Sequence, residues 1–165
     1  MTSVDRDGVR HAGARAAACE LCDAAGGEQI WQRDDIRVVL VDDPLFPGYC
    51  RVVWSGHVRE MTDLDVIARD TFMQVVWQVE RAIRSVMRPE KINLASLGNL
   101  TPHLHWHVIP RYLDDSHFPQ PVWGTQQRTA PAAAIGPRRG MINDLRAAIV
   151  AACNGSDDEI TMGVA

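Results

Sequence analysis

Three histidines, His103, His105 and His107, alternate with single residues in the segment 102–111. The period of two predicts a β-strand on which all three side chains stand in a row on one face, about 6 to 7 Å apart. One of them alone would most simply be a core residue, but three together are costly in a core because each buried imidazole needs partners for both ring nitrogens. Near neutral pH an imidazole can ligate a metal, act as a base or act as a nucleophile. The segment therefore indicates a functional site.

Two cysteines, Cys19 and Cys22, form a Cys-x-x-Cys motif that fits either a redox pair or half of a metal site. A redox pair of the thioredoxin type opens a helix within a βαβ unit, and the sequence around these cysteines has no such pattern. A metal site needs two further ligands. Cys50 and Cys153 are isolated and are interpreted as small apolar residues of the core.

The elements that must position these residues follow from hydrophobic patterns and turn signals. Strands are expected at 29–33, 36–41, 49–54 and 91–97, before the histidine strand. One long amphipathic helix is expected over 62–87, with Thr62 as its N-cap, Asp65 as the acid at the third position, Trp77 in its apolar stripe and Pro89 as its stop. A run of strands interrupted by one helix predicts an α+β fold with a mostly antiparallel sheet of about five strands.

The ends of the chain are less regular. Residues 1–18 are expected to form a mobile arm, 19–111 the core of a single domain, and 112–165 a C-terminal part. That part begins with a proline-rich extended segment over 112–137 and continues with an alanine-rich helix over 138–153, after which the last dozen residues are expected to fray.

Composition excludes several classes of function. The 165 residues carry a net charge of −4 with 17 scattered Lys and Arg residues, so there is no basic face for a nucleic-acid polymer. No apolar run approaches the roughly 20 residues that span a bilayer, and the first residues lack a hydrophobic signal core. A cytoplasmic protein that binds neither nucleic acid nor membrane is expected.

The histidine strand, together with the preceding Asn93 and Gly98-Asn99, the Pro47-Gly48 loop and His57, resembles the signature of the histidine-triad family of nucleotide hydrolases and transferases. The similarity covers roughly residues 19–111. It implies a homodimer with a small-molecule nucleotide substrate.

The resemblance also implies roles for individual residues. His105 would attack the α-phosphorus of a nucleotide to give a covalent nucleotidyl-histidine, and His107 would orient it or stabilise phosphate charge. Asn99 stands near the place of a family Gln and would donate to a phosphate or leaving-group oxygen, unless it is simply a turn residue beside Gly98. Asn93 and Gly98 would support the phosphate site. Asp42 would bind the ribose hydroxyls, unless it is a solvated turn residue.

Three residues depart from the family pattern. Tyr49 replaces a fourth histidine, Trp54 replaces a proline, and Leu100 stands where some relatives carry a serine hydroxyl. These departures leave the contacts of the leaving group open.

The resemblance further implies a structural zinc site, because some relatives bind zinc with such a cysteine pair and two histidines. The ligands here would be Cys19, Cys22, His57 and His103, a closed Cys₂His₂ set. A reduced, metal-free cysteine pair is the alternative.

Three functions compete on this evidence. The first is a nucleotide hydrolase or nucleotidyl transferase acting on a dinucleoside polyphosphate or a nucleoside phosphoramidate. The second is a nucleotide-binding regulatory module with little turnover, which Tyr49 and Asn99 favour. The third is a hydrolase with a three-histidine zinc site, which is disfavoured because three positions on one face of a straight strand do not converge on one ion.

Overall fold

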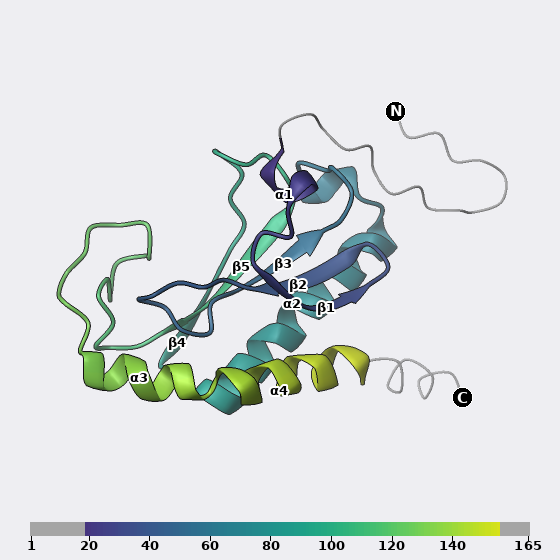
Figure 1. Ribbon diagram of the computed structural model, residues 1–165. Helices are drawn as coiled ribbons and strands as arrows, with labels where there is room; N and C mark the ends of the chain where they lie inside the picture. Colours follow the sequence, from purple (N-terminus) through teal and green to yellow (C-terminus); the bar gives the residue numbers. More distant parts are fainter. Residues whose placement is uncertain (1–18, 156–165) are drawn as a thin grey trace, which may run out of the picture.

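The computed structural model describes residues 19–155, in which five strands and four α-helices follow one another along the chain (Figure 1). The elements are α1 (Glu20–Asp23), β1 (Glu28–Arg33), β2 (Ile36–Leu40), β3 (Cys50–Trp54), α2 (Val66–Met87), β4 (Lys91–Ala95), β5 (His105–Arg111), α3 (Ala132–Gly140) and α4 (Ile142–Asn154). The arm expected over 1–18 and most of the expected frayed end lie outside the described residues.

The strands form one antiparallel sheet in the order β1-β2-β3-β5-β4. This confirms the predicted α+β fold. The histidine strand β5 lies between β3 and the edge strand β4, so its neighbours flank the site on both sides. Arg51 of β3 and Ala95 of β4 both lie opposite His107 in the ladders.

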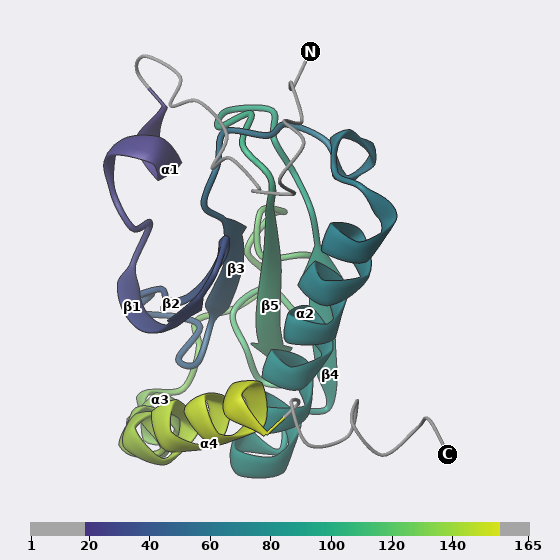
Figure 2. The ribbon, with the colours of Figure 1, turned by 90° about the vertical axis from the view of Figure 1, so that its right-hand side faces the viewer.

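The sheet has two faces with different roles. Alternate residues such as Val38, Val52 and Val108 point toward α2 and α4 and form the main hydrophobic core with them. The opposite face carries the odd-numbered residues of β2, β3 and β5. Helix α1 lies over part of this face, where Cys19 and Leu21 pack against Val39 and Val53. Figure 2 shows α1 and α2 on opposite sides of the sheet, with α4 crossing at its lower end. The histidines of β5 thus lie on the face without the long helices.

The long helix begins later than the sequence predicts. Thr62 lies in a short 3-10 turn, Met61–Asp63, and Asp65 is the N-cap of α2, where its side chain accepts a hydrogen bond from the backbone N–H of Ala68 at 2.8 Å. An aspartate cap satisfies an orphan donor of the first turn as well as a threonine would. Trp77 is 44% exposed rather than part of the core. No helix in the described part of the chain is long and apolar enough to cross a membrane.

The C-terminal segment is also more ordered than the sequence predicts. The helix expected over 138–153 is two helices, because α3 already begins at Ala132 and α4 follows after Met141. The part of the segment predicted as extended thus ends at 131 rather than 137. Figure 1 shows α3 and α4 running nearly end to end across the lower end of α2.

Candidate active site and metal cluster

His105 is the best-oriented nucleophile in the site. Its Nδ1–H donates to the backbone carbonyl of His103 at 2.6 Å, since a carbonyl oxygen can only accept. This leaves the lone pair of the ring on Nε2, which lies 3.1 Å from Nε2 of His107. The backbone near His105 is held by Ser96, whose hydroxyl donates to the carbonyl of His105 at 2.9 Å. The imidazole therefore presents a basic nitrogen in a defined direction.

Both imidazoles are buried and electrically neutral. Burial lowers the pKa of His105, and the nearby Arg51 lowers it further. Burial lowers the pKa of His107 to about 3, with smaller contributions from His105 and Arg51. A neutral imidazole keeps the lone pair that nucleophilic attack needs.

The row of three histidines expected from the sequence is broken at its first member. His103 precedes β5, in the turn that leads into the strand, and its ring faces the cysteines. The rings of His105 and His107 have centroids 4.7 Å apart, closer than the expected spacing, because they tilt edge to face. The structure therefore places two histidines, not three, at the candidate active site.

Three further side chains complete the site and were not among the residues predicted for it. The hydroxyl of Tyr49 forms a hydrogen bond with Nδ1 of His107. Arg51 lies opposite His107 and over the ring of Tyr49, and its Nη1 donates to the carbonyl of Gly26 at 3.2 Å. Trp123 packs edge to face on His107, with centroids 4.9 Å apart. The alternation along β3 could have indicated Arg51, whereas no local signal indicates Trp123.

A buried ion pair holds the loop that carries Trp123. Arg111, the last residue of β5, forms a bidentate pair with Asp115, and it also donates to the carbonyl of Gln120 and to Oδ1 of Asn93. The carboxylate of Asp115 accepts further hydrogen bonds from three backbone N–H groups of the loop. The segment 112–131 is therefore folded against the sheet.

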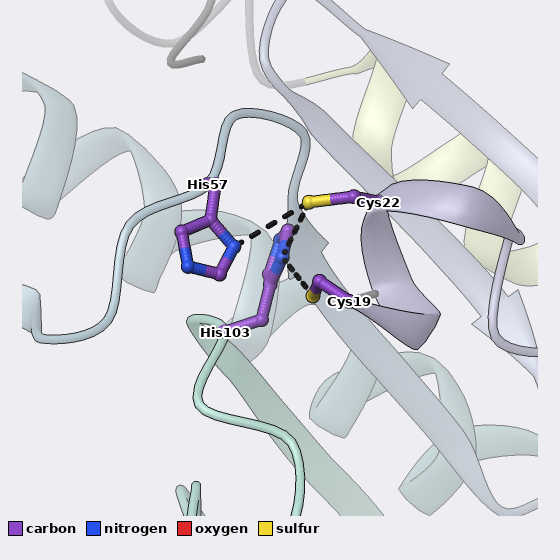
Figure 3. A group of neighbouring side chains, drawn as sticks. All are labelled: Cys19, Cys22, His57 and His103. Carbon is purple, nitrogen blue, oxygen red and sulfur yellow. Dashed lines mark hydrogen bonds between the residues drawn. The ribbon is translucent and has the colours of Figure 1, made fainter. Parts of the chain in front are cut away.

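The metal-ligand candidates come together in one cluster. Cys19 is the N-cap of α1 and Cys22 lies within that helix, whereas His57 follows β3 and His103 precedes β5. Figure 3 shows the four side chains pointing toward one another. Each offers one ligand atom, and these atoms all lie within 4.8 Å of one another. Three sulfur-to-nitrogen distances within the cluster, from Cys19 to His103 and from Cys22 to His57 and His103, are 3.4 to 3.5 Å. A tetrahedral ion with ordinary Zn–S and Zn–N bonds separates sulfur and nitrogen ligands by about 3.5 Å.

The ring of His103 is oriented for ligation. Its Nε2–H donates to the carbonyl of Trp54 at 2.6 Å, which leaves the lone pair on Nδ1, the nitrogen that faces both cysteines. Such a hydrogen bond from the far ring nitrogen is typical of metal-bound histidines. Arg37 of β2 attaches α1 and the residues after it to the sheet, because its guanidinium donates to the carbonyls of Leu21 and Ala25. The donor set and its supports fit a zinc ion.

The remaining predicted residues lie around the two centres. Gly98 and Asn99 lie in the turn between β4 and β5, beside a hollow of about 460 Å³, and Asn99 is exposed. Within residues 19–155, no hydrogen bond joins the side chain of Asn99 to either imidazole. Asn93 bonds to Arg111. The carboxylate of Asp42 is 97% exposed and lies 3.8 Å from Nη1 of Arg139.

The comparisons with known proteins agree with this architecture. The family model described as HIT domain matches residues 26–114. An AP-4-A phosphorylase of Mycobacterium tuberculosis (strain ATCC 25618 / H37Rv) is 32% identical over 89 residues, which is 50% of this chain and 46% of the relative. A bis(5'-adenosyl)-triphosphatase of Saccharomyces cerevisiae (strain ATCC 204508 / S288c) is 28% identical over 92 residues, which is 52% of this chain and 45% of the relative. The chain thus spans about half the length of these curated relatives.

Two solved structures illustrate the likeness in fold. A histidine triad protein from Bradyrhizobium japonicum is 29% identical, with a TM-score of 0.66 over 84% of this chain and 99% of the other. A structure described as a Zn-bound histidine triad family protein from Mycobacterium smegmatis is 19% identical, with a TM-score of 0.52 over 79% of this chain and 97% of the other. At that identity the second likeness concerns the fold alone.

Proposed function

Because the chain belongs to the HIT domain family, as the match over more than half of its residues shows, we propose that it is a nucleotide hydrolase or nucleotidyl transferase. The observation that carries this proposal is the orientation of His105. Its Nδ1–H is held by the carbonyl of His103, so the lone pair on Nε2 is available beside His107 and Arg51. This is the arrangement that an imidazole nucleophile needs.

The proposed reaction has two displacements at phosphorus. Nε2 of His105 attacks the α-phosphorus of a nucleoside phosphate conjugate, the bond from phosphorus to the leaving group breaks, and a nucleotidyl-histidine forms. Water or another acceptor then attacks the same phosphorus and releases His105. Splitting one displacement into two lowers each barrier.

The other residues bind and orient the substrate. His107 and Arg51 supply a hydrogen-bond donor and a positive charge beside the phosphates, which stabilise charge that develops on the phosphoryl oxygens. Asn99 is proposed to donate to a phosphate or leaving-group oxygen. Asn93 is proposed to support the phosphate site through Arg111, and Asp42 to bind the ribose hydroxyls.

The proposed substrate is a dinucleoside polyphosphate or a nucleoside phosphoramidate. The first class is supported by the names of the two curated relatives, each of which matches over about half its own length. The second class rests on the chemistry alone, because an imidazole can displace an amine from phosphorus in the same way.

We also propose that zinc is bound by Cys19, Cys22, His57 and His103. The support is the closeness of the four ligand atoms and the hydrogen bond from His103 to Trp54. Zinc in such a closed Cys₂His₂ set ties chain segments together rather than taking part in the reaction. Here it would join α1 to the loops that precede β5 and follow β3.

A homodimer is proposed as the assembled form. Strand β4 lies at the edge of the sheet, so one side of its backbone is unpaired within residues 19–155. A groove of about 520 Å³ runs beside it, lined by Glu80, Pro119, Pro121 and Trp123 among others. Light scattering at micromolar concentration tests this proposal, and a monomeric mass would count against it.

A single-turnover experiment tests the catalytic proposal. Protein in excess over adenine-labelled diadenosine tetraphosphate, quenched at short times, should carry label that is stable to alkali and labile to acid, as a phosphorus–nitrogen bond is. The second candidate, a regulatory module with little turnover, is favoured by the exposed position of Asn99 away from the imidazoles. Tight nucleotide binding without trapped label would support the module instead.

A further inference from the structure

We propose that Tyr49 is a positioning residue that fixes His107 in the tautomer with its proton on Nε2, so that the site presents one donor beside one nucleophilic lone pair. The inference rests on the proposed function for its consequence, since it takes His105 as the nucleophile. The tautomer itself is a property of the protein without substrate. Tyr49 would act through His107 and would not touch the reacting phosphorus.

The argument begins at the backbone. The carbonyl of His103 is an acceptor without a proton, so Nδ1 of His105 must be the donor in the contact between them. A neutral imidazole carries one N–H, and Nε2 of His105 is therefore an acceptor. If His105 carried its proton on Nε2 instead, its unprotonated Nδ1 and the carbonyl oxygen of His103 would be two acceptors 2.6 Å apart.

The next contact depends on the first. Nε2 of His107 lies 3.1 Å from the acceptor Nε2 of His105, so the two nitrogens form a hydrogen bond only when a neutral His107 carries its proton on Nε2 and donates it there. Its Nδ1 is then an acceptor. The group at Nδ1 is the hydroxyl of Tyr49, which can donate.

The surroundings of Tyr49 favour that direction. Its ring is buried in a small cluster with Phe46 and with Ile109 of β5. The guanidinium of Arg51 lies over the ring at 5.8 Å. A cation beside a phenol stabilises negative charge on the oxygen and directs the O–H proton away from itself. The proton of Tyr49 therefore lies toward His107.

The chain of donors has a consequence for the site. When the phosphorus of a substrate takes the lone pair of His105, the Nε2–H of His107 loses its resting acceptor. It then faces the phosphoryl oxygens, to which it can donate. Without the hydroxyl of Tyr49, Nδ1 of His107 has no donor, and the ring can shift its proton to Nδ1 and present a second lone pair to the substrate.

Nuclear magnetic resonance of ¹⁵N-histidine-labelled protein tests the tautomer directly. In the wild-type chain, we expect the ring nitrogens of His107 to show the proton on Nε2. In Tyr49→Phe, which keeps the ring and its packing, we expect a mixture that includes the Nδ1–H form. A wild-type His107 with its proton on Nδ1, or a Tyr49→Phe spectrum identical to the wild type, would overturn the proposal.

Kinetics supply the second readout. Tyr49→Phe should lower kcat for diadenosine tetraphosphate about ten- to a hundredfold with little change in KM, by analogy with the loss when a group that orients a metal-bound imidazole is removed. Tyr49→His, which restores an N–H donor, should recover much of the rate. A rise in KM at constant kcat would contradict the proposal.

The chain offers a matched control in its second tyrosine. Tyr112 is also buried, and its hydroxyl donates to the carbonyl of Met87 at 3.0 Å, away from the histidines. Tyr112→Phe should change neither the tautomer of His107 nor kcat. If the protein shows the expected tautomers but no turnover, the proposed function fails while the positioning role of Tyr49 stands.

Discussion

Arg111 and Asp115 form a bidentate ion pair in which both side chains are only 2% exposed, at the point where β5 ends and the C-terminal loop begins. Neighbouring backbone N–H groups donate further hydrogen bonds to the carboxylate oxygens of Asp115. Burial alone would raise the pKa of Asp115, but the hydrogen bonds from Arg111 and from these backbone groups lower it below its usual value. Through this pair, the end of the histidine strand holds the loop that brings Trp123 onto His107.

Removing one partner of this pair should destabilise the protein strongly. Asp115→Ala leaves the guanidinium of Arg111 buried and unpaired, and we expect a loss of about 3 to 5 kcal/mol in the free energy of unfolding. The neighbouring Asp114 pairs with Arg138 at a more exposed position, so Asp114→Ala should cost less than about 1 kcal/mol. Urea denaturation measures both, and equal losses would contradict the assignment.

His105 should be indispensable for turnover. His105→Ala removes the reaction path itself and should abolish hydrolysis while nucleotide binding is largely retained. Asn99→Ala removes at most one donor and should lower turnover by no more than about 10²- to 10³-fold, with His107→Ala between the two. A tenth or more of the wild-type rate in His105→Ala would exclude it as the nucleophile.

The metal cluster should bind zinc with a stoichiometry near one. Cys22→Ser should lose most of the metal and lower the melting temperature, because binding to a site formed only in the folded state is coupled to folding. Cys153→Ala is the control, since Cys153 is buried in the main core rather than in the cluster. Elemental analysis of protein purified without chelator measures the zinc content. A content well below one equivalent per chain in the wild type would refute the site.

Arg51 should contribute to phosphate binding. Arg51 lies opposite His107 in the strand ladder, and its charge lowers the pKa of both imidazoles. Its Nε has no hydrogen-bond partner in the described structure, and no carboxylate among residues 19–155 forms an ion pair with it. Arg51→Met should weaken nucleotide binding about 10- to 100-fold, the worth of a hydrogen bond to a charged group. Arg84→Met removes an exposed charge from α2 and should leave calorimetric affinity unchanged. Equal affinities of the two variants would disprove the role.

The protein should lose stability in mild acid. The pKa of His107 is lowered from 6.5 to about 3, so between these values the unfolded chain binds a proton that the folded chain does not. The free energy of unfolding therefore falls as pH drops through this window, by up to about 1.4 kcal/mol per pH unit for this residue, and is fully restored above about 6.5. His103 and His105, whose pKa values are also lowered, act in the same direction.

His107→Gln isolates the contribution of one imidazole, because Gln does not titrate and His107 is not a metal-ligand candidate. Denaturation midpoints measured from about pH 7 to about pH 4 should fall less steeply in this variant than in the wild type. Identical slopes would show that folding does not lower the pKa of His107.

The sequence by itself determined the local structure. Alternation predicts β5 and its neighbours, and it also determines that His105 and His107 share a face, because successive side chains of a strand point to opposite sides. The 3.6-residue period predicts α2 and its end before Pro89. Its start was missed because both Thr62 and Asp65 can cap a helix, and only the path of the chain before them decides between the two.

The tertiary structure decided which groups meet. Tyr49 and His107 are 58 residues apart, and Cys19 and His103 are 84 apart. Such contacts depend on the order and register of the strands and on the loops between them, which no local pattern specifies. His103 leaves the row predicted for it because the turn before β5 directs its ring to the cysteines. Trp123 packs on His107 from a loop that the buried pair of Arg111 and Asp115 holds against the sheet. Burial of two opposite charges is a property of the folded chain, where each charge has its partner in a site that excludes water.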